Sequence, residues 1–269
     1  MSRRSADAAG PDTAPGPGLP VYHFPGRDGA ELAWREMGAG RPLVLLHGLL
    51  GSGAQLAGSG PARALAAQGY RVILPDLRGH GDSARPHDPA CYPPDVLADD
   101  GLALIGHLGL DDYDLCGYSL GGRLVLRLLV RGARPGRAVV AGQGLDALDQ
   151  ESGRTDGHRR VLTALARGEA FEEGTAQAQL ASWISETGTD PQAVRCVLDT
   201  FVATPKDALR QVPTPTLIVT GDRDSRGASA GALADLLPSA RVVQVPGDHS
   251  TALGAPEFTR AVLAFLGDS

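Results

Sequence analysis

The stretch GYSLGG, residues 117–122, is the most informative segment of this 269-residue sequence. It follows a short apolar run, Tyr113–Cys116, and opens the segment Ser119–Val130, whose apolar residues recur at helical spacing. The pattern G-x-S-x-G between a strand and a helix is a nucleophile elbow, a sharp turn that lifts a serine hydroxyl clear of the sheet. Its glycines remove side chains that would collide at the turn. The chain contains 36 glycines, so the pattern alone is weak, but this setting predicts that Ser119 is a nucleophile.

Short apolar runs alternate with helical patterns on both sides of this turn. The expected strands are Val21–Phe24, Glu31–Met37, Pro42–His47, Arg71–Pro75, Tyr113–Cys116, Arg137–Ala141, Thr216–Thr220 and Arg241–Val245. The expected helices between and after them are Ala62–Gln68, Pro94–Leu108, Ser119–Val130, Ala228–Leu237 and Pro256–Leu266. Strands that alternate with helices form βαβ units, so we expect a doubly wound α/β fold with a mostly parallel eight-stranded sheet.

A polar, helical segment interrupts this alternation at residues 145–209. Its expected helices are Val161–Ala166, Ala176–Ser185 and Pro191–Ala203. We expect it to form a small helical cap, inserted into an α/β core of residues 19–144 and 210–269. Its large rings are Phe171, Trp183 and Phe201. The favoured role for all three rings is packing of the cap onto the core, and substrate contact by Trp183 is the weaker alternative.

The first eighteen residues have a different composition. Residues 1–18 are rich in proline, glycine, alanine and serine and lack apolar periodicity, which predicts a disordered tail. Arg3 and Arg4 are not followed by the apolar segment of a secretory signal. We therefore expect a cytoplasmic protein.

Composition excludes several classes of protein. The chain carries 25 lysines and arginines against 31 aspartates and glutamates, and this net charge of −6 argues against a nucleic-acid partner, which needs a basic face. Three scattered cysteines without C-x-x-C spacing predict neither a disulfide framework nor a cysteine zinc site. No apolar run reaches the roughly 18 residues that a transmembrane helix needs, so no membrane association is expected.

Polar segments follow three other expected strands. They are HGLLG at residues 47–51, GDRD at residues 221–224 and PGDHS at residues 246–250. In an open α/β sheet, ligands bind beyond the carboxyl ends of the strands. His249 completes the chain order serine, acid, histidine and is expected to take the proton of Ser119. Asp222 or Asp224 would orient that histidine, and the alternative role for either is to cap a turn.

The HGLLG segment predicts an oxyanion hole. A glycine at position 48 lets the backbone approach a substrate oxygen, so the N–H of Leu49 could act together with the N–H of Leu120. One such donor is typically worth about 10²- to 10³-fold in turnover. The imidazole of His47 is expected to brace this loop through hydrogen bonds.

Together these features resemble the α/β-hydrolase superfamily over roughly residues 21–266. The segment DLRGHGDS, residues 76–83, adds to the resemblance, because family members carry a similar D-x-R-G-x-G-x-S loop that is usually structural. The resemblance implies Ser119 as the nucleophile and His249 as the base. It implies Asp224 rather than Asp222 as the acid, because members with a G-D-x-D signature generally use the second aspartate. Asp146 is a less favoured acid, which some members place after the sixth strand.

The same resemblance implies a reaction class. It implies a hydrolase that cleaves an ester, thioester or lactone of a small-molecule acyl substrate through an acyl-enzyme on Ser119, with no metal or organic cofactor. Epoxide hydrolases and haloalkane dehalogenases of this fold have aspartate at the elbow, so the serine argues against them. Carbon–carbon bond hydrolysis, acyl transfer and perhydrolysis by the same triad stay open. A non-catalytic receptor for a small ligand is the alternative outside the enzymes.

Overall fold

The computed structural model describes residues 18–148 and 156–267. The predicted disordered tail lies outside these residues except for Gly18. Within the described ranges, no helix is both long enough and apolar enough to cross a membrane.

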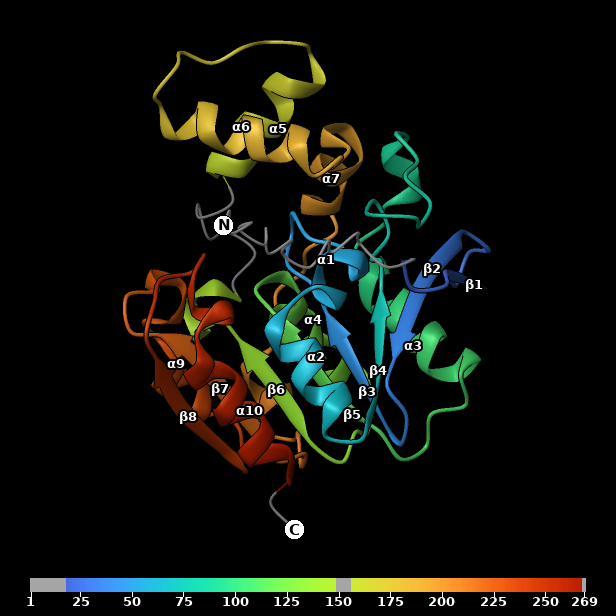
Figure 1. Ribbon diagram of the computed structural model, residues 1–269, viewed down its shortest axis with the longest axis vertical. Helices are drawn as coiled ribbons and strands as arrows, with labels where there is room; N and C mark the ends of the chain where they lie inside the picture. The colour runs from blue at the N-terminus through green and yellow to red at the C-terminus, as the bar shows by residue number, and fades with distance from the viewer. Residues whose placement is uncertain (1–17, 149–155, 268–269) are drawn as a thin grey trace, which may run out of the picture.

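One sheet of eight strands forms the centre of the molecule, in the order β1-β2-β4-β3-β5-β6-β7-β8 (Figure 1). The strands are β1 (Tyr22–Pro25), β2 (Glu31–Met37), β3 (Arg41–Leu46), β4 (Tyr70–Pro75), β5 (Asp114–Tyr118), β6 (Ala138–Ala141), β7 (Thr216–Gly221) and β8 (Ala240–Val245). The hairpin of β1 and β2 joins the sheet antiparallel, and β4, β3 and β5 to β8 are parallel. The predicted doubly wound, mostly parallel eight-stranded fold is confirmed.

Helices cover both faces of the sheet. Those of the core are α1 (Gly53–Ala57), α2 (Gly60–Ala67), α3 (Val96–His107), α4 (Leu120–Val130), α9 (Ala230–Ala234) and α10 (Pro256–Gly267). Helices α3, α4 and α9 supply buried side chains to one apolar cluster, and α1, α2 and α10 to the other. The two clusters lie on opposite faces, which is the layer arrangement of a doubly wound domain.

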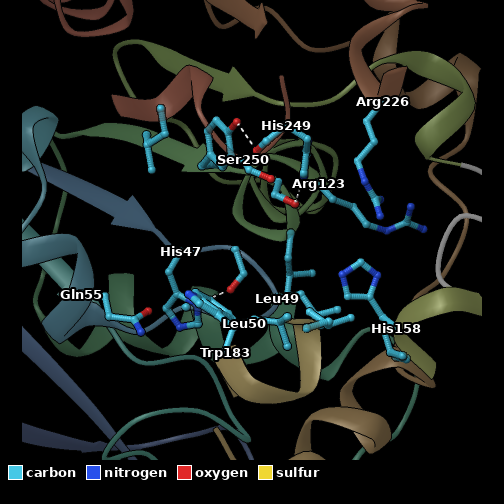
Figure 2. Close-up of a pocket in the computed structure, with 18 of the residues that line it drawn as sticks. His47, Leu49, Leu50, Gln55, Arg123, His158, Trp183, Arg226, His249 and Ser250 are labelled. Carbon is cyan, nitrogen blue, oxygen red and sulfur yellow. Dashed lines mark hydrogen bonds between the residues drawn. The ribbon is translucent and has the colours of Figure 1, made fainter. Parts of the chain in front are cut away.

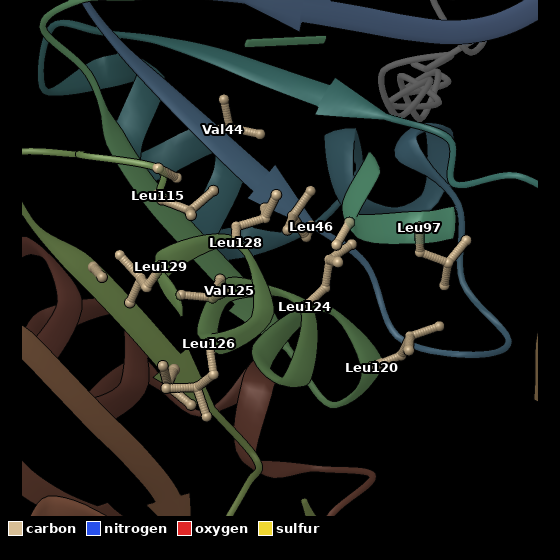
Figure 3. Packing of buried hydrophobic residues seen from close by; sticks show 14 of the residues in the cluster. Val44, Leu46, Leu97, Leu115, Leu120, Leu124, Val125, Leu126, Leu128 and Leu129 are labelled. Carbon is tan, nitrogen blue, oxygen red and sulfur yellow. The ribbon is translucent and has the colours of Figure 1, made fainter. Parts of the chain in front are cut away.

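The continuous apolar run of β3 shows why the sheet is buried on both faces. Val44 and Leu46 belong to the α4-side cluster, whereas Leu43 and Leu45 belong to the other cluster. Successive side chains of a strand point to opposite faces, so a strand between two helical layers needs apolar residues at every position. Figure 3 shows Leu46 of this strand close to Leu128 of α4, in the cluster that also contains Val44.

The segment between β6 and β7 is helical. It contains α5 (Asp156–Ala166), α6 (Ala176–Glu186), α7 (Pro191–Leu198) and the short α8 (Lys206–Leu209). Helices α5, α6 and α7 lie beyond one end of the sheet (Figure 1) and share a small apolar cluster that includes Leu162, Ile184 and Val194. Leu50 of the core joins this cluster, whereas Leu209 of α8 packs into the main core.

Several predicted boundaries are wrong. Helix α1 was not expected, and β5 continues through Gly117 to Tyr118, so the strand runs directly into the elbow. The predicted helix Pro191–Ala203 ends at Leu198, because the hydroxyl of Thr200 donates to the carbonyl of Val197 and takes over a helix-terminal acceptor. The predicted helix Ala228–Leu237 is shorter in the structure and corresponds to α9. After α9 the N–H of Leu236 donates to the carbonyl of Leu233, which is the i to i−3 bond of a tighter 3₁₀ turn.

Candidate active site

The elbow at Ser119 has strained backbone geometry. Strand β5 ends at Tyr118, α4 begins at Leu120, and Ser119 between them has φ 56° and ψ −114°. A positive φ is unfavourable for a residue with a side chain, and such strain concentrates at functional sites. A Cβ at position 121 would lie 2.2 Å from the carbonyl oxygen of Leu46, so only glycine allows the helix to start this close to β3. The fold thus requires the glycine of the motif.

Ser119, His249 and Asp224 form one chain of hydrogen bonds. The Oγ of Ser119 lies 2.8 Å from Nε2 of His249, and Nδ1 of His249 lies 2.8 Å from Oδ2 of Asp224. The carboxylate can only accept, so Nδ1 carries the ring proton and Nε2 is left to accept the hydroxyl proton of Ser119. The side chain of Asp224 is fully buried, and that of His249 is 30% exposed. The three predicted residues are therefore brought together in the order that nucleophilic catalysis needs.

The carboxylate of Asp224 is held in its ionised form. Burial by itself would raise its pKa, but the hydrogen bond and charge of His249, with the N–H of Arg226 at 2.8 Å from Oδ1, outweigh burial and lower it. Asp222 faces elsewhere: its Oδ1 accepts the N–H of Gly247 at 2.9 Å. Asp222 thus braces the turn that carries the histidine. Asp146 is exposed.

Tyr118 fixes the histidine loop from the elbow side. Its hydroxyl donates to the carbonyl of His249 at 2.8 Å, and the two rings lie 5.6 Å apart. Gln143, two residues after β6, donates to the carbonyl of Ser119 at 2.6 Å. Both ends of the bond between Ser119 and His249 are therefore anchored through the backbone.

The predicted oxyanion loop passes directly over Ser119. A Cβ at Gly48 would lie 3.4 Å from Cβ of Ser119. In the part of the chain that the structure describes, the N–H groups of Leu49 and Leu120 engage no hydrogen bond. Both are therefore able to donate to an oxygen bound at Ser119.

His47 supports this loop from below. The N–H of Leu77 donates to its Nε2 at 3.0 Å, so its Nδ1 carries the proton and donates to the carbonyl of Gly48 at 2.7 Å. That carbonyl belongs to the same peptide group as the N–H of Leu49. The predicted bracing role of His47 matches this geometry. His80 continues the support, with Nε2 at 2.6 Å from the carbonyl of Leu49.

A cavity of about 1080 Å³ opens at Ser119. Its walls come from the core and from α5, α6 and α7, so the helical segment forms a roof over the elbow (Figure 2). Phe171 is partly buried and packs against the apolar cluster of this segment. The packing prediction is wrong for Trp183, which lines the cavity and is 42% exposed.

Several lining side chains were not singled out from the sequence. They are Gln55, Arg123, Gln143, His158, Arg159, Arg226 and Ser250. His158 carries no local motif that would predict a functional role. It lies on α5, about forty residues after the elbow (158 − 119 = 39). Periodicity along the sequence does not predict that a residue at this distance will line the cavity.

Groups able to hold a metal are absent from the described residues: no three histidine, cysteine, aspartate or glutamate side chains cluster there with the required geometry.

Comparison with known proteins agrees with the fold. Residues 41–141 match the family model of the alpha/beta hydrolase fold. The chain is 30% identical to a non-heme haloperoxidase of Rhodococcus erythropolis, over 82% of this chain and 89% of that protein. It is also 30% identical to a non-heme chloroperoxidase of Kitasatospora aureofaciens, over 89% and 97% of the two chains. The chain therefore belongs to the alpha/beta hydrolase family of enzymes.

Solved structures share the same architecture. A thermophilic esterase from Thermogutta terrifontis superposes with a TM-score of 0.74 at 23% identity, over 92% of this chain and 98% of that one. At this identity the likeness concerns the fold.

Proposed function

We propose that the protein is a serine hydrolase that cleaves an ester, thioester or lactone of a small-molecule acyl substrate through an acyl-enzyme on Ser119. The single observation that carries the proposal is the hydrogen-bonded chain from Ser119 through His249 to Asp224, with both links at 2.8 Å. The strained elbow supports it, because strain at a hydroxyl-bearing residue is costly and is found where function requires it.

The first half of the proposed reaction forms the acyl-enzyme. Oγ of Ser119 attacks the acyl carbonyl while Nε2 of His249 takes the hydroxyl proton, and Asp224 stabilises the imidazolium that results. The carbonyl oxygen becomes an oxyanion and accepts hydrogen bonds from the N–H groups of Leu49 and Leu120. The leaving group departs with the proton from His249.

The second half releases the acid. Water attacks the acyl-enzyme while His249 takes a proton from that water. The tetrahedral intermediate then collapses, the bond between Oγ and the acyl carbon breaks, and His249 returns the proton to Oγ of Ser119 as the carboxylic acid leaves. These residues supply the nucleophile, the base and the oxyanion donors.

A fluorophosphonate probe tests this proposal. We expect the probe to label Ser119, located by peptide mass spectrometry, and we expect His249→Ala to abolish the labelling. Ser119→Ala is the negative control, which should not be labelled. Multiple turnovers of an ester panel would then separate an enzyme from a ligand receptor that keeps the triad. Unlabelled, well-folded protein would overturn the proposal and favour the receptor.

Perhydrolysis is the second candidate, and the names of the two 30%-identical relatives favour it. Hydrogen peroxide would replace water as the attacking group and would release a peracid from the same acyl-enzyme. We expect the activity to show as bromination of monochlorodimedone in the presence of acetate, peroxide and bromide. Ester hydrolysis without any bromination would exclude it.

A further inference from the structure

The side chain of Trp183 is exposed to the active-site cavity. It is 42% exposed, although removing the surface of a large apolar side chain from water is favourable. Four residues of α6 line the cavity, at positions 176, 179, 180 and 183. This spacing of i, i+3, i+4 and i+7 places them on one face of the helix. Trp183 therefore presents apolar surface to the same cavity that opens at Ser119.

The phenylalanine and tyrosine rings of the cavity wall already have partners. Among the described lining residues, the ring of Tyr118 lies 6.0 Å from that of Phe258. The guanidinium of Arg123 lies 5.0 Å from the centre of the Phe201 ring. Within the described chain, no ring or guanidinium lies against the indole of Trp183. The indole is thus an aromatic surface that a bound molecule can cover.

Trp183 and the catalytic base lie on different sides of this cavity. Figure 2 shows Trp183 and His249 at opposite sides of the close-up, with Leu49 and Leu50 between them. All four residues line the cavity. An apolar stretch of wall thus connects the predicted oxyanion donor at Leu49 with the indole.

The end of α6 supports this placement. Trp183 lies in the last turn of the helix, and Thr187 and Gly188 follow it. These two residues line a second cavity, of about 310 Å³, together with Gly51 and Gln55 of the core. The last turn of α6 therefore lies beside the end of the HGLLG loop and the start of α1.

The geometry of ester cleavage assigns a side of the cavity to each half of the substrate. The leaving oxygen must lie within reach of Nε2 of His249, which delivers the proton to it. The acyl substituent leaves the scissile carbon in a different direction and extends away from His249. Trp183 lies on that side, beyond the loop that holds Leu49.

We propose that Trp183 is a specificity-determining residue that packs against an aromatic ring in the acyl part of the substrate, so that the enzyme prefers arylalkanoyl esters. This inference rests on the proposed serine hydrolase function and names its substrate class. Two aromatic rings prefer offset-stacked or edge-to-face contact, which the accessible indole offers. The cavity of about 1080 Å³ has room for such a substrate, since pockets of about 300–1,000 Å³ hold drug-sized ligands.

Isomeric esters test both the ring and its side. Methyl 4-phenylbutanoate carries a phenyl ring on its acyl part, and 3-phenylpropyl acetate carries the same ring on its alcohol. Methyl butanoate and propyl acetate are the parents without the ring. For each side, kcat/KM with the ring divided by kcat/KM without it defines the ring effect, measured by titration of the released acid. We expect an acyl-side ring effect of about 10- to 100-fold, as for the burial of one ring, and an alcohol-side effect at least about fivefold smaller.

Variants then assign the acyl-side ring effect to the indole. We expect Trp183→Ala to lower it at least about fivefold and Trp183→Phe to retain part of it, because phenylalanine offers a smaller aromatic face. Tyr22→Ala removes a ring of similar exposure, 41%, from the edge strand β1 and should keep the wild-type effect. Because each ester and its parent are measured on one preparation, a general loss of folded enzyme cancels from the ratio.

Tryptophan fluorescence measures the same contact without turnover. The chain contains two tryptophans, and the other, Trp34, is 7% exposed and does not line the cavity. In the Ser119→Ala protein we expect methyl 4-phenylbutanoate to shift the emission to shorter wavelength, because its ring removes water from the indole of Trp183. Trp183→Phe in the same background should abolish the shift.

The outcomes separate this inference from the proposed function. Equal ring effects on the two sides, an acyl-side effect that survives Trp183→Ala, or an emission that methyl 4-phenylbutanoate leaves unchanged would overturn the inference while ester hydrolysis stands. No hydrolysis of any ester, together with no fluorophosphonate labelling of Ser119, would overturn the proposed function. The emission of the Ser119→Ala protein would then still decide whether Trp183 binds the aryl group.

Discussion

At the scale of single residues, and outside the triad, His47 is the residue whose burial most clearly affects how the stability of the protein depends on pH. It is 1% exposed, and its ring lies 4.8 Å from the ring of His80. Burial lowers its pKa, and the neighbouring His80 adds to the effect. The folded protein therefore holds the neutral ring that donates to Gly48, whereas the unfolded chain takes up a proton near the ordinary histidine pKa of about 6.5.

This difference makes stability depend on pH. Below about pH 6.5 the unfolded state binds more protons than the folded state, so the free energy of unfolding falls as the pH falls, by up to about 1.4 kcal/mol per pH unit for each such histidine. We expect His47→Gln to flatten this slope between pH 5 and pH 7.5 in urea unfolding. His23→Gln, on the edge strand β1 and 43% exposed in its side chain, should leave it unchanged. Identical slopes in all three proteins would contradict the buried neutral histidine.

The two aspartates of the β7 turn have separable roles. Asp224→Asn removes the carboxylate charge and introduces an amide N–H that can donate to Nδ1 of His249, which leaves the ring proton on Nε2. We expect kcat on a p-nitrophenyl ester to fall by about 10⁴-fold. Asp222→Asn disturbs only the turn at Gly247, and we expect less than a tenfold loss. Equal losses in the two variants would show that the assignment of the acid to Asp224 is wrong.

At the scale of elements, the start of α4 is constrained by the strands on either side of it. Gly121 lies against the backbone of β3, and a Cβ at Gly117 would lie 2.3 Å from the carbonyl carbon of Gly121. Both contacts involve backbone atoms, which cannot rotate away. The helix can therefore approach the sheet closely enough to present Ser119 only if these positions lack side chains.

We expect Gly121→Ala to lower the free energy of unfolding by about 1–3 kcal/mol, the usual cost of overpacking, and to displace Ser119. The matched control is Gly106→Ala in α3, where an added Cβ meets no atom within 4 Å. It should raise stability by about 0.4–1 kcal/mol, because alanine restricts the unfolded chain. Denaturant titration and fluorophosphonate labelling measure the two effects. An unchanged stability of Gly121→Ala would mean that the helix start can shift.

At the scale of the whole molecule, Arg78 joins three separate segments. Its side chain is 1% exposed, and its guanidinium binds Asp100 of α3, Asp28 in the β1–β2 turn and the carbonyl of Cys91. Burial raises the pKa of Asp100, and Arg78 opposes that rise. The expected structural role of the D-x-R-G loop thus has a definite form, which is a buried cation that ties the edge hairpin to the core.

We expect Arg78→Met to lower the free energy of unfolding by about 3–5 kcal/mol, because it leaves the carboxylate of Asp100 buried without a counter-charge. The double variant Arg78→Met with Asp100→Leu should recover most of this loss, since an apolar pair of similar volume avoids the desolvation cost. Chemical denaturation of the three proteins measures the coupling. A double variant no more stable than the single one would assign the loss to the contacts of Arg78 with Asp28 and Cys91.

Local sequence was enough to predict the α/β scaffold and two members of the triad, Ser119 and His249. Alternating apolar runs and helical patterns predict strands and helices because side-chain direction repeats every 2 residues in a strand and every 3.6 in a helix. The elbow can be predicted from its six residues because backbone sterics allow few other conformations for this pattern of glycines between a strand and a helix. Ser119 and His249 each follow a predicted strand. Because parallel strands bring their carboxyl ends to one edge of the sheet, the sequence also predicts that these two residues lie close together.

The choice of the acid and the composition of the cavity wall depend on the tertiary structure. Asp222 and Asp224 are two residues apart and chemically identical, and only the direction of the turn gives one to His249 and the other to Gly247. The position of His158 in the cavity wall depends on how the segment between β6 and β7 folds back over the sheet. Local periodicity does not encode such contacts, because they arise from packing between residues that are far apart in the chain.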